Sequence, residues 1–327
     1  MRIVGREDLA QLLPMGTAIE LMRELFANIE TPAVVQPLRS VVRVDGQPSV
    51  LGSMPAFVAI DAVRGYGTKT VVVNPENAAR GMDTHLGAVL VFDPLTGQPA
   101  AVLEAGALTG IRTAAVSAVA TDALAPAAAR ELAVLGSGVQ ARLHLEAISM
   151  VRPLTGVSVW SRTREHAEAF ARWARGAFDL PVRMCESGGE AAARADIVCT
   201  VTGSATPVLA LADVRPGAHI NAVGACFPTA RELASDLVCA ARIVVDSVES
   251  ALAEAGDLLI PISEGCLRSA DVNTTLAGVL TRAAIGRRHD DQVTVFESLG
   301  LAAEDVAAGC YVARRARETD AGIEVPF

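Results

Sequence analysis

The sequence predicts an α/β protein in which a doubly wound parallel sheet follows a smaller α+β domain. Three observations support this fold class. Short β-rich runs between residues 34 and 103 are divided by turn signals, as in antiparallel sheets. Strand-like and helix-like runs alternate from residue 132 to residue 246, as in βαβ units. A glycine-rich segment at residues 136–141 lies between a predicted strand and a predicted helix.

The first domain is expected to begin with a helix over residues 19–29, because apolar residues recur there at three- and four-residue steps, and Thr17 is its expected cap. A helix of small residues is predicted from Ile111 to Leu124. Between the two helices we predict strands and turns at residues 41–44, 45–46, 70–73, 89–92 and 94–97. This domain should cover residues 1–118. A C-terminal helix within residues 305–327 has no strand partner nearby in sequence, so it can pack back on this domain.

The second domain, residues 119–304, should be the doubly wound sheet. Its first strand, residues 132–135, is wholly apolar, as in parallel strands buried on both faces. Further strands are predicted at residues 157–160, near 182, and at 197–200, 220–223 and 243–246. Helices are predicted at residues 139–149, 165–174 and near 191.

Composition limits the class of protein. The chain has 327 residues, which suggests two domains at the usual size of roughly 150 residues each. Hydrophobic residues make up 51% and charged residues 20%, a globular rather than a disordered composition. The net charge of −9 argues against nucleic acid and anionic membrane surfaces as partners, because no excess of basic residues neutralises their charge.

The six cysteines show no close paired spacing, so we expect them to be reduced and structural. The first residues lack the apolar core of a signal peptide. The most apolar later run, residues 113–129, is interrupted by Asp122 and Pro126 before it reaches spanning length. These features predict a cytoplasmic protein with no membrane partner.

The glycine-rich segment matches the dinucleotide-binding fingerprint in its expected context. Gly136 allows the tight turn, Gly138 lets the backbone approach the pyrophosphate, and Ala141 permits close packing of helix on strand. The first helical turn, with Val139 and Gln140, offers amide donors and a positive dipole end to the phosphates. A glycine-rich turn without a ligand is the plainer alternative.

Ser161, Arg162 and Thr163 predict the choice of cofactor. An acidic residue at this distance from the fingerprint would bind the ribose 2′-hydroxyl of NAD, but the sequence has no carboxylate there. Arg162 can pair with a 2′-phosphate, and the two hydroxyls can donate hydrogen bonds to it. We therefore expect NADPH in preference to NADH, with NADH possible. The alternative is that Arg162 is an ordinary solvated residue.

Lysine is almost absent: of 28 Lys and Arg residues only Lys69 is a lysine, and the other 27 are arginine. Lys69 stands at the head of a β-branched run, so its side chain should project from a strand. A partly desolvated lysine can lose its proton near neutral pH and act as an acid or base, whereas an arginine cannot. Lys69 is therefore the candidate catalytic residue, and a snorkelling surface lysine is the alternative.

Arg39 and Arg112 stand beside apolar neighbours instead of in charged runs. A guanidinium group binds a carboxylate through two parallel hydrogen bonds, so both are candidates for holding an acidic substrate. Each is equally compatible with a buried structural ion pair. The five histidines show no metal spacing, so no metal is expected, and His144 should pack inside the protein.

Over essentially its whole length the chain resembles the ornithine cyclodeaminase/μ-crystallin family, and within it the μ-crystallin-type ketimine reductases. The fingerprint belongs to this resemblance. The other matching stretches are Gln36-Pro37-Leu38-Arg39, Gly52-Ser53-Met54-Pro55, Thr68-Lys69 and residues 112–118, 160–163, 219–225, 231–233 and 294–300.

The resemblance implies a substrate-binding and dimerisation domain, completed by the C-terminal helix, together with a Rossmann domain and a homodimer. It implies that Lys69 acts at an imine or amine centre. Arg39 and Arg112 would hold the substrate carboxylate, with Met54 beside it. Residues implied near the cofactor are Thr84, His85, Thr113, Thr202, Val223 and Ser298.

One position departs from the deaminating branch of the family, where an aspartate acts in the chemistry and this sequence has Cys226. A thiol with an ordinary pKa of about 8.5 is a poor substitute, so ornithine cyclisation is disfavoured. The expected activity is NADPH-dependent reduction of the C=N bond of a small cyclic ketimine carboxylate, such as pyrroline-2-carboxylate or piperideine-2-carboxylate. The alternatives are an ornithine cyclodeaminase, an alanine-type amino-acid dehydrogenase, and a non-catalytic NADPH-bound ligand-binding protein.

Overall fold

The computed structural model describes residues 1–326, which form two compact units. The first unit contains Met1–Thr113 and the segment from Gly300 onward, and the second contains Ala114–Leu299. The sequence places the domain boundaries after residues 118 and 304, whereas the two compact units divide after residues 113 and 299. Helix α3 (Ala105–Leu124) runs without a break through the first boundary, so no turn or linker in the sequence marks it.

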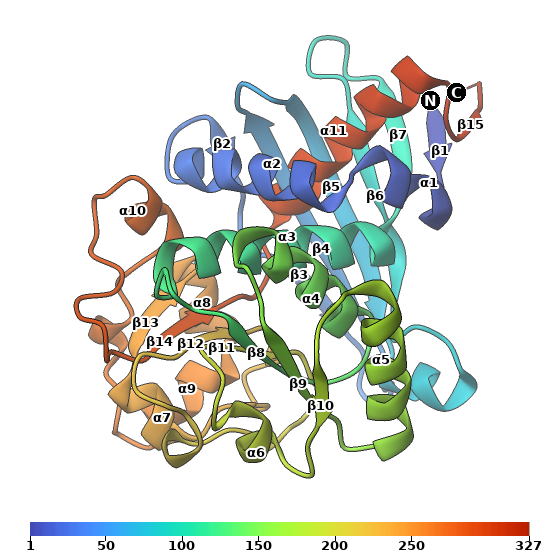
Figure 1. Cartoon of the computed structure of the whole chain (residues 1–327). Coiled ribbons are helices and arrows are strands. Elements are labelled where there is room, and N and C mark those ends of the chain that lie inside the picture. The colour runs from blue at the N-terminus through green and yellow to red at the C-terminus, as the bar shows by residue number, and fades with distance from the viewer. Residues whose placement is uncertain (327) are drawn as a thin grey trace. The chain divides into compact units, whose positions relative to one another are not determined.

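The first unit is built on an eight-stranded, mostly antiparallel sheet, as predicted (Figure 1). The strand order is β15-β1-β7-β6-β5-β4-β2, and β3 also pairs with β4. The strands are β1 (Arg2–Val4), β2 (Val34–Val35), β3 (Ser40–Arg43), β4 (Val50–Ala59), β5 (Arg64–Val73), β6 (His85–Phe92), β7 (Pro99–Glu104) and β15 (Ile323–Glu324).

Helices α1 (Arg6–Leu12), α2 (Met15–Asn28) and α11 (Ala302–Thr319) and the 3-10 turn η1 (Pro75–Arg80) complete this unit. The prediction that Thr17 caps the first long helix is wrong: α2 begins at Met15, and Pro14 holds the N-cap position. Helix α11 lies against β5, where a Cβ at Gly65 would stand 2.6 Å from the Cys310 sulfur. A Cβ at Gly67 would stand 3.0 Å from a methyl carbon of Val306, so Gly65 and Gly67 together let the C-terminal helix approach β5 closely.

The second unit is a seven-stranded parallel sheet with the order β10-β9-β8-β11-β12-β14-β13, the doubly wound arrangement that was predicted (Figure 1). The order reverses between β8 and β11, so the topological switch point lies there. The strands are β8 (Glu131–Leu135), β9 (Gly156–Trp160), β10 (Val182–Met184), β11 (Ile197–Thr200), β12 (His219–Ala222), β13 (Arg242–Val245) and β14 (Thr294–Glu297). Strand β14, between β12 and β13, was not predicted.

The helices of the second unit connect these strands. They are α4 (Val139–Val151), α5 (Arg164–Ala177), α6 (Gly188–Ala192), α7 (Ser235–Ala240), α8 (Val248–Glu254), α9 (Gly256–Ser263) and α10 (Leu276–Leu280), with 3-10 turns η2 (Leu211–Asp213) and η3 (Ser269–Asp271). His144 on α4 is fully buried and lies 2.9 Å from the Ser117 hydroxyl, which confirms its packing role.

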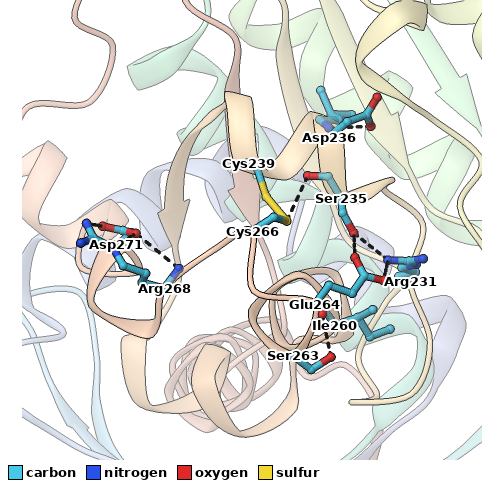
Figure 2. Close-up of a disulfide and its surroundings, with 11 residues drawn as sticks. Arg231, Ser235, Asp236, Cys239, Ile260, Ser263, Glu264, Cys266, Arg268 and Asp271 are labelled. Carbon is cyan, nitrogen blue, oxygen red and sulfur yellow. Dashed lines mark hydrogen bonds and ion pairs between the residues drawn. A yellow bond between two sulfur atoms is a disulfide. The ribbon is translucent and has the colours of Figure 1, made fainter.

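The expectation that all cysteines are reduced is wrong for one pair. Cys239 at the end of α7 and Cys266 after α9 form a disulfide, with their Cα atoms 6.2 Å apart (Figure 2). The two are 27 residues apart in sequence, and only the packing of α7 against α9 brings them together. Sequence spacing alone therefore gave no signal for this bond.

Two further findings concern residues 1–326 only. In that range no helix is both long enough and apolar enough to cross a membrane. The same residues contain no group of three or more His, Cys, Asp or Glu side chains arranged to hold a metal ion.

Candidate active site

Four buried charged side chains meet in the first unit. The Lys69 Nζ lies 2.7 Å from Oδ2 of Asp305. Arg112 donates through Nε to Asp305 Oδ1 at 3.0 Å and through Nη1 to Glu304 Oε2 at 2.6 Å. Lys69 is 5% exposed, Arg112 is 3% exposed, and both acids are fully buried. We call these four residues the charge cluster.

Each member of the charge cluster is positioned by a regular element. Lys69 projects from the middle of β5, directly opposite Met54 on β4. Arg112 lies on α3, and the two acids lie in the first turn of α11. Carboxylates are favoured in a first turn by the helix dipole, and Glu304 also accepts from the Leu301 N–H at 3.1 Å. Glu304 is therefore held to the start of its helix as well as to Arg112.

Gly300 connects Arg112 with Arg39. The Arg39 Nη2 donates to the Gly300 carbonyl at 2.9 Å. Gly300 has a φ of +77°, and a Cβ there would lie 2.4 Å from the Arg112 guanidinium. Glycine is thus required for the backbone conformation and for the close approach to Arg112. The structure therefore brings Lys69, Arg39 and Arg112 into one region of the first unit.

Burial and neighbouring charges tune the protonation of Lys69. Burial lowers the pKa of Lys69, the charges of Arg112 and Arg39 lower it as well, and Asp305 raises it, so that together they bring it from 10.5 to about 8. Burial alone would raise the pKa of Asp305, but the charges of Arg112 and Lys69 hold it below its ordinary value. An amine with a pKa near 8 is protonated at pH 7 and can still release its proton.

Arg112 differs from a freely available carboxylate binder. Its Nε and Nη1 already donate to Asp305 and Glu304, which is the buried ion-pair alternative considered for this residue. These two charges raise its pKa against the effect of burial. Arg39 is only half-buried, and its Nη2 donates to the Gly300 carbonyl. Of the two arginines, Arg39 is therefore the more exposed.

The other residues expected near the substrate or cofactor in this unit lie as follows. Met54 is 4% exposed and neighbours Lys69 across the sheet. The Thr84 hydroxyl lies 3.0 Å from Nδ1 of His85, an exposed residue at the start of β6. Thr113 is buried and follows Arg112 on α3.

In the second unit the glycine-rich loop joins β8 to α4 at the carboxyl edge of the sheet. Gly136 has a φ of +120°, and a Cβ there would lie 2.7 Å from the Val201 carbonyl oxygen. A Cβ at Gly138, the N-cap of α4, would instead stand in open space. Packing within the protein thus explains why position 136 is a glycine but not why position 138 is one. A ligand bound at the N-terminus of α4 explains both, because it needs close approach to the loop backbone.

A cavity of about 240 Å³ opens beside the end of β9. Ser161 and Arg162 line it, together with Arg164 and Glu186, which form an ion pair at 2.8 Å. The Ser137 hydroxyl of the glycine-rich loop donates to the Ser161 hydroxyl at 2.9 Å, so the loop and the cavity are directly linked. Arg162 is exposed, and Thr163 holds the N-cap position of α5 at the same edge without a capping hydrogen bond from its side chain.

The loops after β11, β12 and β14 carry Thr202, Val223 and Ser298, and a residue that we had not predicted links the first two loops. The buried carboxylate of Glu232 accepts the Thr202 N–H at 2.6 Å and the Gly224 N–H at 2.7 Å. Burial raises the pKa of Glu232, and hydrogen bonds from Thr202 and Gly224 oppose that rise. The sequence gave a weak signal, because Glu232 lies within one of the stretches that carry the family resemblance.

Comparison with known proteins defines the family. Residues 2–320 match the model of the ornithine cyclodeaminase/mu-crystallin family. The chain belongs to this family. A Δ1-pyrroline-2-carboxylate reductase from Bacillus cereus is 35% identical over 100% of both chains. The ketimine reductase mu-crystallin of Mus musculus is 42% identical over 86% of each chain.

A solved structure of this family has the same fold. The Δ1-pyrroline-2-carboxylate reductase of Thermococcus litoralis, solved with NADH and L-proline, aligns with a TM-score of 0.96 at 33% identity. The alignment covers 99% of this chain and 100% of that one. The second unit is thus the Rossmann-type domain of the family, and its loop, helix N-terminus and cavity fit a dinucleotide.

Proposed function

We propose that this protein reduces the C=N bond of a small cyclic ketimine carboxylate with NAD(P)H and forms the cyclic amino acid. The substrate class is pyrroline-2-carboxylate or piperideine-2-carboxylate. The observation that carries the proposal is the buried Lys69, whose amine has a pKa of about 8 and lies beside two arginines. Membership of a family whose relatives include pyrroline-2-carboxylate and ketimine reductases supports it.

In this proposal each residue has a distinct task. A bound nicotinamide supplies the hydride that reduces the imine carbon. Arg39 binds the substrate carboxylate, and Arg112, fixed by its ion pairs, adds positive charge beside it. Lys69 hydrogen-bonds the imine nitrogen and donates its proton there, and Asp305 orients the amine. Met54 shapes the apolar side of the ring pocket.

The test is the absorbance of the reduced cofactor in the presence of pyrroline-2-carboxylate and piperideine-2-carboxylate, with proline and pipecolate identified as products. Lys69→Arg keeps a positive charge but removes a proton that can leave near neutral pH. We expect this variant to lose most turnover and to retain cofactor binding. Turnover at the wild-type rate would remove Lys69 from the mechanism.

We further propose a preference for NADPH, with Arg162 binding the 2′-phosphate and Ser161 and Thr163 donating hydrogen bonds to it. The position of Arg162 in the wall of the cavity after β9 supports this. Comparison of KM for NADPH and NADH tests it: equal or better use of NADH would contradict the preference.

The lyase and binding-protein alternatives make different predictions. Cys226, where the deaminating branch has an aspartate, donates its thiol to the Val223 carbonyl at 3.4 Å. A thiol in that role argues against ammonia release from ornithine. Ammonia formed from ornithine would favour the lyase. Reversible NAD(P)-dependent deamination of alanine would favour a dehydrogenase. Cofactor binding without turnover of any ketimine would favour a binding protein.

We also propose a homodimer formed through one face of the first-unit sheet. Val42, Leu51, Val72 and Leu86 lie opposite one another on β3, β4, β5 and β6 and are 57%, 37%, 40% and 42% exposed. By strand alternation this row lies on the face opposite Lys69. Exposed apolar rows of this kind mark interaction surfaces. Light scattering should give twice the chain mass, and Leu51→Glu should give a monomer.

Finally, we propose that the protein works in the cytoplasm. Disulfides persist mainly in oxidising compartments, so the Cys239–Cys266 bond is the observation that tests this location. Thiol alkylation of cells before lysis, followed by mass spectrometry of the Cys239 and Cys266 peptides, separates the cases. Complete oxidation of the pair in cells would contradict a reducing cytoplasm.

A further inference from the structure

We propose that Glu232 is a positioning residue that shapes the nicotinamide end of the cofactor site. This inference rests on the proposed use of NAD(P)H. Glu232 does not line the cavity after β9; it acts through the backbone of the two loops that follow β11 and β12.

The contacts of Glu232 are unusual because both carboxylate oxygens are used for loop backbone. Oε1 accepts the Thr202 N–H at 2.6 Å, and Oε2 accepts the Gly224 N–H at 2.7 Å. Thr202 follows β11 and Gly224 follows β12, so one fully buried side chain fixes the spacing of two neighbouring loops. Charge-assisted hydrogen bonds of this type are about twice as strong as neutral ones.

The two loops are packed as closely as the backbone allows. A Cβ at Gly224 would lie 2.1 Å from the Thr202 carbonyl oxygen and 2.6 Å from the Glu232 carboxylate. No side chain fits between the two loops at Gly224, so their separation is set by direct backbone contact and by the Glu232 carboxylate that bonds both.

Glu232 is itself held by a second buried carboxyl group. Asp257, in the first turn of α9, accepts the N–H groups of Glu232 and Leu233 at 2.9 and 2.7 Å. The Cys239–Cys266 disulfide and the Arg231–Glu264 ion pair tie α9 to the segment that carries Glu232 (Figure 2). Glu232 lies at the far end of the loop after β12, residues 223–234, and these contacts fix its backbone without using the Thr202 and Gly224 N–H groups that its side chain binds.

The sheet topology indicates which end of the cofactor this arrangement serves. In a doubly wound sheet the two halves of a dinucleotide bind on the two sides of the switch point, which here lies between β8 and β11. The β9 side carries Ser161 and Arg162 and suits the adenosine half. The loops after β11 and β12 belong to the other side and would receive the nicotinamide half.

The experiment is a pair of binding measurements on Glu232→Gln. A glutamine amide has one acceptor oxygen and one NH₂ group, so it can accept only one of the two N–H groups and turns a donor toward the other. We measure Kd for NADPH and for 2′-phospho-ADP-ribose, which lacks nicotinamide. We expect the Kd for NADPH to rise about tenfold or more, while the Kd for the fragment changes less than about threefold.

Asp196→Asn is the matched control. Asp196 also accepts two backbone N–H groups, those of the consecutive residues Arg130 and Glu131 at 2.8 and 3.0 Å, and so ties its own segment to theirs, but at the amino edge of the same sheet. This variant should lower Tm without changing the ratio of the two Kd values.

The outcomes are distinct. A rise in the NADPH-to-fragment Kd ratio in Glu232→Gln but not in Asp196→Asn supports the proposal. An unchanged ratio, an equal loss for both ligands, or wild-type chain that does not bind NADPH overturns it. Because the readout is binding, a shifted ratio in a protein that turns over no ketimine would leave Glu232 positioned as proposed and would refute only the proposed reaction.

Discussion

Replacing Asp305 by asparagine tests whether Lys69 is the proton donor. Asp305→Asn is nearly isosteric but removes the negative charge 2.7 Å from Lys69 Nζ. That charge is the main influence that keeps the pKa of Lys69 as high as about 8. Without it, burial and the two arginines act unopposed, so the amine should lose its proton at lower pH.

The expected magnitude follows from the geometry. An opposite charge within about 4–6 Å shifts a pKa by about 1–3 units, so the pKa of Lys69 should fall from about 8 by that amount. If protonated Lys69 is required, log kcat/KM declines above this pKa, and the decline in the variant should begin about 1–3 pH units lower. At pH 7.5 the protonated fraction would fall about threefold or more.

Glu304→Gln is the matched control for this experiment. Glu304 is equally buried and bonds Arg112, but the salt bridge of Lys69 is to Asp305. Breaking either buried pair should lower stability by about 3–5 kcal/mol, so both variants should lose Tm. Only Asp305→Asn should shift the alkaline limb of the pH profile of ketimine reduction. Superimposable profiles for wild type and Asp305→Asn would refute the assignment of Lys69 as the titrating donor.

Three further predictions concern the second unit. Burial and the neighbouring Glu232 raise the pKa of Asp257 to about 8 from an ordinary 3.8. Because the folded state then holds a proton that the unfolded state has lost, stability should fall by about 2 kcal/mol between pH 6 and pH 8, and Asp257→Asn should flatten Tm against pH. Cys239→Ser removes the disulfide that closes a loop of 27 residues, so the free energy of unfolding measured in urea should fall by about 2–4 kcal/mol. Wild-type protein with the disulfide reduced should lose the same amount. Arg162→Ala should raise KM for NADPH about tenfold and leave KM for NADH unchanged; a parallel rise in both would contradict a 2′-phosphate contact.

The features that were predictable from the sequence are those encoded locally. The dinucleotide loop requires Gly136 and Gly138 at fixed spacing between a strand and a helix, and all of these are adjacent in the chain. Lys69 was singled out by composition, since an arginine cannot act as an acid near neutral pH. Both signals depend on residue type and short-range order, which a single sequence contains.

The features that were missed depend on long-range packing. Asp305 lies 236 positions from Lys69 in the chain (305 − 69), and in sequence it appears as an ordinary first-turn acid of a helix. Only the return of α11 to β5 brings it to the amine. The same limit applies to Cys239 and Cys266 and to Glu232, whose partners are backbone groups that no sequence pattern identifies.

The charges around Lys69 also suggest why its pKa lies near 8. With both acids ionised, Lys69, Arg39 and Arg112 leave this region with a formal charge of +1, which one substrate carboxylate neutralises. In the proposed reaction Lys69 gives its proton to the imine nitrogen, so the region together with the carboxylate goes from 0 to −1, while the nicotinamide that gives up the hydride would gain +1. Loss of the lysine charge weakens the hold on the product carboxylate, and that carboxylate together with the two acids favours return of a proton to the amine from solvent. A lysine with an ordinary pKa of about 10.4 would release its proton reluctantly, and one far below 7 would not be protonated again at neutral pH.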